Sequence, residues 1–208
     1  MIGIYFFPKR LHARLLAARD LNTPPTILGA LAADPVEEVR LGVAGNPKTP
    51  KGVWILLLND QNSMVRAEIA ARSDLDQESI LKLANDRSEN VCKEISCRED
   101  LNDDALKILV NKSIPIRIQL ASNSNKFSDW LSVKLAKDAD SRVRVLVAAS
   151  TKSESAINIL RNDSDWSVQD SLASREFNQE LSEMRKKFDF RSSPSLEDQF
   201  VKKNNINL

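Results

Sequence analysis

The stretch DPVEEVRLGVAGNPKTPKGVWILLLND, residues 34–60, recurs in register along most of the chain. Its Val39-Arg40 pair returns at intervals of 25 to 27 residues as Val65-Arg66, Val91-Cys92, Ile116-Arg117, Val143-Arg144 and Val168-Gln169. Toward the N-terminus, the same step of 26 residues leads from Arg40 to Arg14. About seven units therefore cover residues 8–188, and self-similarity at such a period is the signature of a repeat architecture.

The first half of each unit carries two apolar residues four positions apart, which places both on one face of a helix. These pairs are Val39/Val43, Val65/Ile69, Val91/Ile95, Ile116/Leu120, Val143/Val147 and Val168/Leu172. A small residue follows each pair and allows neighbouring helices to approach closely: Ala44, Ala70, Ser96, Ala121, Ala148 and Ala173. Asp34 and Asp86, each followed three residues later by a glutamate, predict helices that begin at an aspartate N-cap.

The second half of each unit opens with a residue that can cap a helix start, namely Thr23, Thr49, Asp76, Asn102, Ser128 or Ser153. Apolar pairs three or four apart follow: Leu28/Leu31, Trp54/Leu57, Ile80/Leu83, Leu106/Leu109, Leu131/Leu135 and Ile157/Leu160. Burial of one Val or Leu is worth only about 1.5–3 kcal/mol before the entropy cost, so a single unit would not fold alone. A row of units shares one core, which predicts a solenoid.

We therefore expect an all-α fold, a right-handed α-solenoid of about seven two-helix repeats of 25–27 residues with short second helices. Residues 8–188 form the solenoid as a single domain in this interpretation. Residues 1–7, with their apolar run at residues 4–7, are expected to cap the first unit, because terminal layers must be sealed from water. Residues 189–208 leave the repeat and form a C-terminal tail, either disordered or folded back on the solenoid.

The motif D-P-x-x-x-V-R-x-x-V-A-x-N-P-x-T-P, carried by residues 34–50, resembles the leucine-rich repeat variant motif. That family is similar to HEAT and armadillo arrays, and the resemblance covers nearly all of residues 8–188. It implies an all-helical superhelix in which some second helices can be of 3₁₀ type. One branch of the family carries an iron–sulfur cluster on N-terminal cysteines, but this chain has no cysteine before Cys92, so we expect no cofactor.

Composition places the chain among ordinary globular proteins. It has 208 residues, of which 42% are hydrophobic and 28% charged, with a formal net charge of +1. This near-neutral balance gives no overall field that attracts nucleic acid or anionic lipid. The two cysteines, Cys92 and Cys97, indicate a reducing compartment. No apolar run approaches the roughly 20 residues of a membrane span, and the N-terminus does not read as a signal peptide, so we expect a cytoplasmic protein.

An Asp and an Arg six residues apart recur as the most prominent polar feature. Asp34/Arg40, Asp60/Arg66 and Asp138/Arg144 follow the pattern, Asn111/Arg117 is a weaker copy, and Asp86/Cys92 and Asp163/Gln169 interrupt it. We interpret the pattern as a structural ladder in which each aspartate accepts hydrogen bonds from an arginine in its own or an adjacent unit. The alternative is a column of arginines that binds phosphate.

Two loops between helices are rich in acids, at residues 73–78 and 98–104. The candidate partner-binding residues there are Asp74, Asp76, Glu99, Asp100, Asp103 and Asp104. Adjacent units would bring these acids together to attract a basic protein surface, and the alternative is a solvated edge whose acids cap helices. Trp166 is a further candidate, because its register predicts that it points outward as a contact hot spot. The tail could instead cover it with Phe190, Leu196 or Phe200.

Catalytic signals are sparse. His12 is the single histidine, and Cys92 and Cys97 lack the spacing of a metal site, so we expect neither an enzyme nor a metal. The leading hypothesis is a non-enzymatic, monomeric scaffold that binds another protein. The alternative is a nucleic-acid-binding HEAT-like protein, at the extreme a DNA glycosylase, that uses cations on its second helices: Lys51, Lys82, Lys107, Lys134 and Arg161.

Overall fold

The computed structural model describes residues 10–123, 126 and 128–187. These residues form thirteen α-helices and no strand. In chain order the helices are α1 (Leu11–Arg19), α2 (Pro25–Leu31), α3 (Glu37–Gly45), α4 (Lys51–Leu57), α5 (Ser63–Ala70), α6 (Gln77–Ala84), α7 (Glu89–Ser96), α8 (Asp103–Leu109), α9 (Ile114–Ser122), α10 (Asp129–Leu135), α11 (Ser141–Ser150), α12 (Glu154–Leu160) and α13 (Trp166–Lys187).

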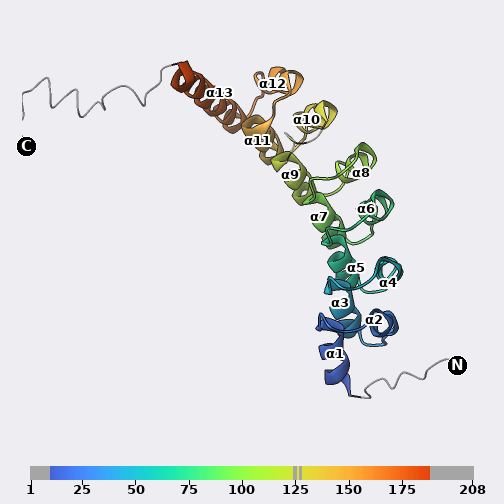
Figure 1. Ribbon diagram of the computed structural model, residues 1–208. Helices are drawn as coiled ribbons and strands as arrows, with labels where there is room; N and C mark the ends of the chain where they lie inside the picture. Colours follow the sequence, from blue (N-terminus) through green and yellow to red (C-terminus); the bar gives the residue numbers. More distant parts are fainter. Residues whose placement is uncertain (1–9, 124–125, 127, 188–208) are drawn as a thin grey trace, which may run out of the picture.

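The helices form a curved row of two-helix units (Figure 1). Each odd-numbered helix contacts the next odd-numbered helix, from α1 through to α13, and Figure 1 shows these helices along the inner side of the arc. The even-numbered helices lie on the outer side, where most of them also pack against the odd-numbered helix that follows. The predicted all-α solenoid is thus confirmed as an all-helical array in which neighbours in sequence are neighbours in space.

One hydrophobic core runs along the row. Both members of every predicted apolar pair are buried, in the first helices and in the second helices alike. The small residues after these pairs lie where the next first helix packs, and Ala44, Ala70 and Ala148 are fully buried. Ala173 on α13 is exposed, because no helix follows α13 among the described residues. The apolar surface of each unit is therefore covered by its neighbours.

The first helices begin later than the sequence indicates. α3 starts at Glu37 and α7 at Glu89, so the prediction that Asp34 and Asp86 are their N-caps is wrong. The Asp34 carboxylate instead accepts a hydrogen bond from the backbone N–H of Val36, which makes a short turn ahead of the helix. An arginine of the preceding unit also holds this carboxylate, and that contact keeps it outside the first helical turn.

The second helices are α-helical over seven or eight residues. Their backbone bonds include the four-residue step of an α-helix, as from the N–H of Trp54 to the carbonyl of Pro50 at 3.1 Å. The 3₁₀ character that the family resemblance implies is not observed in these helices. None of the described helices combines the length and the apolar character needed to cross a bilayer.

The starts of five second helices follow two different designs, whereas α10 has Ser128 at its N-cap without a side-chain cap bond. Asp76, Asn102 and Ser153 are N-caps whose side chains accept a backbone N–H, as predicted. Thr23 and Thr49 are not caps, because α2 and α4 begin two residues later, behind a proline. Each threonine hydroxyl donates instead to a backbone carbonyl of the preceding first helix at 2.6 Å. These bonds tie the two helices of one unit together.

Candidate functional site

The Asp and Arg side chains of the repeat meet between units. Arg66 on α5 donates from Nε and Nη2 to the Asp86 carboxylate at 2.7 and 2.8 Å, and from Nη1 to the backbone carbonyl of Asp60 at 2.7 Å. The carboxylate of Asp60 accepts from Arg40 of the preceding unit at 2.6 and 3.0 Å. The same inter-unit ion pair recurs as Arg14–Asp34, Arg117–Asp138 and Arg144–Asp163.

This ladder is largely buried, with Arg40 and Arg66 only 6% and 5% exposed. The hydrogen bond to Asp86 raises the pKa of Arg66 even though burial opposes its charge. Burial also opposes the charge on Asp60, but hydrogen bonds from Arg40 and from the N–H of Asn62 outweigh it, so the pKa of Asp60 is lowered. Because the guanidinium groups are bound to carboxylates and carbonyls, this column joins units and offers little to phosphate.

The ladder is interrupted between α7 and α9. Cys92 replaces the arginine, and its Sγ lies 3.2 Å from the carbonyl of Asp86. Asn111 replaces the aspartate and donates its amide to a carbonyl of its own unit. Arg117 binds the carbonyl of Lys112 at 2.7 Å, so Asn111 and Arg117 do not form the side-chain pair that their spacing suggests. A cavity of about 140 Å³ lies beside Cys92 at this missing rung.

A second column of inter-unit bonds escaped the sequence reasoning. Asn46, Arg72 and Arg98 follow the first helices of successive units and donate to carbonyls at the end of the preceding first helix. Arg72 Nη1, for example, donates to the carbonyl of Ala44 at 3.1 Å, and the Asn46 amide donates to that of Ala18 at 3.0 Å. These bonds satisfy carbonyls that a helix end leaves without partners. The sequence signal that could have predicted this column is the recurrence of a side-chain donor every 26 residues, at Asn46, Arg72 and Arg98.

The acids proposed as a docking patch are engaged within the chain. Asp74 and Asp100 are exposed, but hydrogen bonds from Arg72 and Arg98 hold the pKa of each carboxyl below its usual value. The other four also have partners: Asp76 with Lys51, Glu99 with Lys126, Asp103 with Ser128 and Asp104 with Lys107. These loops therefore carry mostly paired charges, which reduces the attraction they could exert on a basic surface.

Trp166 is the first residue of α13 and is 77% exposed, as its register predicts. It occupies the position of Ser141 one unit earlier, at the start of α11. The tail residues proposed to cover it, Phe190, Leu196 and Phe200, lie outside the described residues. Figure 1 shows α13, the helix that begins with Trp166, at the opposite end of the arc from α1.

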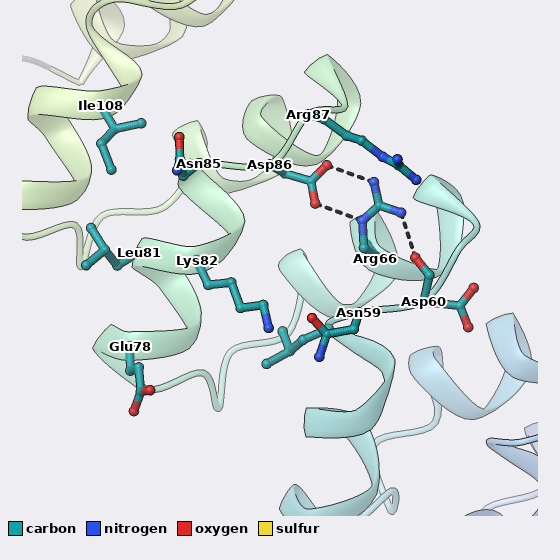
Figure 2. A pocket seen from close by; sticks show the side chains of 11 residues that line it. Asn59, Asp60, Arg66, Glu78, Leu81, Lys82, Asn85, Asp86, Arg87 and Ile108 are labelled. Carbon is teal, nitrogen blue, oxygen red and sulfur yellow. Dashed lines mark hydrogen bonds and ion pairs between the residues drawn. The ribbon is translucent and has the colours of Figure 1, made fainter.

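A groove of about 730 Å³ lies between the end of α4 and the helices α6 and α8. Leu81 and Ile108 supply apolar surface along one side (Figure 2). Figure 2 also shows Lys82 reaching from α6 toward Asn59, and Arg87 lying beside the ion pair of the ladder. The groove thus combines an apolar side with donor side chains from two successive units.

Four donor side chains of the groove make no hydrogen bond or ion pair within the part of the chain that the structure describes: Asn59, Lys82, Asn85 and Arg87. All four are exposed, and Asn59 and Asn85 occupy equivalent positions one repeat apart. Lysine and arginine can donate to carboxylates or carbonyls, and an amide can both donate and accept. The described residues contain no cluster of three His, Cys, Asp or Glu side chains that could hold a metal ion.

No family model matches this chain, and none of the curated proteins compared with it is detectably similar. The resemblance of residues 34–50 to the leucine-rich repeat variant motif therefore remains a prediction from the sequence.

Proposed function

We propose that this protein is a non-enzymatic scaffold that binds another protein, and that the groove between α4 and α6 receives an extended segment of the partner. The supporting observation is a set of donors that make no hydrogen bond or ion pair with the residues the structure describes: Asn59, Lys82, Asn85 and Arg87. Along the two inter-unit columns, by contrast, polar side chains are bound to the neighbouring unit. The groove gathers these four donors around an apolar side formed by Leu81 and Ile108.

The chemistry of the groove favours an extended peptide with acidic side chains. A peptide in this conformation presents carbonyl acceptors along its length, which amide and cationic donors can bind. Its carboxylates would pair with Lys82 and Arg87. Two acids of the lining, Asp60 and Asp86, are already neutralised by arginines of the ladder, so Glu78 is the one acid there that would repel them. The proposed partner is therefore acidic, whereas the loop acids had suggested a basic one.

Charge reversal in the groove tests this proposal. The tagged full-length protein and the variant Lys82→Glu/Arg87→Glu would be used to capture proteins from native lysate, with quantitative mass spectrometry as the readout. The matched control is Lys48→Glu/Lys152→Glu, which makes the same change in net charge at exposed lysines that do not line the groove, one between α3 and α4 and one between α11 and α12. We expect a partner that wild type and control retain and the groove variant loses. If all three proteins capture the same set, the groove is not the binding site.

The nucleic-acid alternative receives less support from the second helices. Three of the five cations that it would use form ion pairs with acids: Lys51 with Asp76, Lys107 with Asp104 and Arg161 with Glu176. A gel shift titrated against salt would detect phosphate binding, because such binding weakens steeply as ionic strength rises.

A further inference from the structure

α13, the first helix of the last unit, is longer than the first helices of the other units. α13 runs for 22 residues, whereas α11 has 10. Val168 and Leu172 are buried against the core. The opposite face carries Trp166, Phe177 and Met184, which are 77%, 60% and 46% exposed. At about 100° per residue these three lie within about 20° of one line along the helix.

Ala173 and Leu181 border this line, and we call the resulting surface the α13 stripe: Trp166, Ala173, Phe177, Leu181 and Met184. The C-terminal half of the stripe has little support from the solenoid. Arg161 on the α12 side reaches Glu176 at 3.0 Å, and from residue 177 to 186 every residue is exposed except the half-buried Leu181. Isolated helices shorter than about 12–15 residues are marginal in water, so covering this face would stabilise it.

We propose that α13 pairs with α13 of a second copy of this chain, in an antiparallel contact with two-fold symmetry centred on Phe177. In that arrangement the two Phe177 side chains meet near the axis. Leu181, four residues after Phe177, then lies against Ala173 of the second copy, four residues before its Phe177. A large side chain is thus placed opposite a small one on each side of the axis, as close packing requires.

Charge supports the antiparallel direction. Asp170 lies seven residues before Phe177 and Arg185 eight residues after it, and helical geometry places both on the same side of the stripe. Antiparallel pairing brings Asp170 of one copy to Arg185 of the other at both ends of the contact. Parallel pairing would instead place Asp170 at the level of Asp170 of the second copy, and Arg185 at the level of its Arg185. These two ion pairs therefore favour the antiparallel direction over the parallel one.

The end of the ladder argues against stacking copies head to tail as further repeats. Gln169 stands where earlier units have an arginine, and its amide donates to the carbonyl of Asp163 at 2.6 Å. It lacks the guanidinium fork that would hold an aspartate of a following unit. A two-fold contact forms a closed dimer of two copies and does not require an arginine–aspartate pair between successive units.

Sedimentation of the full-length protein across about two decades of concentration tests the proposal. The wild-type mass should rise from monomer toward dimer, in place of the monomer expected from the sequence. Phe177→Glu should abolish the rise. Leu56→Glu is the matched control, because Leu56 is 65% exposed on α4, outside the stripe, and this variant should associate like wild type. Circular dichroism would check that both variants keep their helices.

A charge exchange tests the register. Asp170→Arg alone should weaken association by roughly tenfold, and Asp170→Arg/Arg185→Asp should restore it, since the exchange rebuilds both ion pairs. A wild-type protein that stays monomeric at every concentration would overturn the proposal, and so would a dimer that survives Phe177→Glu. An exchange that fails to restore association would overturn the antiparallel register.

Discussion

Arg66→Ala is the most direct test of what holds neighbouring units together. Arg66 makes two hydrogen bonds to the Asp86 carboxylate and two to backbone carbonyls, those of Asp60 at 2.7 Å and Gln61 at 3.3 Å. Removing its side chain leaves the Asp86 carboxylate, which is 10% exposed, with a hydrogen bond from the N–H of Ser88. The cost is therefore that of leaving a nearly buried charge without its partner.

Breaking a buried ion pair in this way typically costs about 3–5 kcal/mol. The rung lies beside the open groove, where water and Arg87 can partly solvate Asp86. We therefore expect the free energy of unfolding to fall by about 2–3 kcal/mol, which is at or just below the lower limit of that range. Arg66→Lys keeps the charge but loses the planar fork, and should cost about half as much.

Urea denaturation followed by circular dichroism measures the change. Arg142→Ala serves as the control, because Arg142 forms an exposed ion pair with Asp140 and its removal should leave the midpoint nearly unchanged. A double-mutant cycle between Arg66→Ala and Asp86→Ala should show a coupling above about 1 kcal/mol. A loss below about 0.5 kcal/mol for Arg66→Ala would refute the view that the ladder joins the units.

Three further predictions follow from the same frame. Cys92→Arg combined with Asn111→Asp should rebuild the missing rung, so that the pair is more stable than the sum of the single changes by about 1 kcal/mol or more in urea melts. The pKa values of Asp60 and Asp86 are lowered in the folded state, so their stabilisation is present above the unfolded value of about 3.9 and is lost as pH falls through the folded values. Melting temperature should therefore drop below about pH 4, and a flat profile there would contradict the assignment. Thr49→Val should cost about 1 kcal/mol by removing one of the two hydrogen bonds that the Val43 carbonyl of α3 accepts, the other coming from the N–H of Asn46, and an unchanged midpoint would show that the threonine bond is dispensable.

Local pattern was enough to predict the helices and their buried faces. Val39 and Val43 recur at a fixed period with apolar partners in the second half of the unit, and the side-chain period of a helix then determines which residues face the core. The same reasoning misplaced the helix starts at Asp34 and Asp86. An N-cap bond joins residues only a few positions apart. At Asp34 and Asp86 the carboxylate is instead bound by an arginine 20 positions earlier, Arg14 and Arg66 respectively.

The amino-acid sequence alone therefore determined the repeat, the all-helical fold and the core positions, because each depends on spacing along one helix. Only the tertiary structure decided which side chains are left without partners. Five of the six loop acids form ion pairs, and Asn46 and Arg72 donate to carbonyls of the preceding unit. Lys82 and Arg87 make no hydrogen bond or ion pair within the described part of the chain. Such pairing depends on how one unit is placed against the next, and that placement follows from packing across the whole row and not from any single stretch of chain.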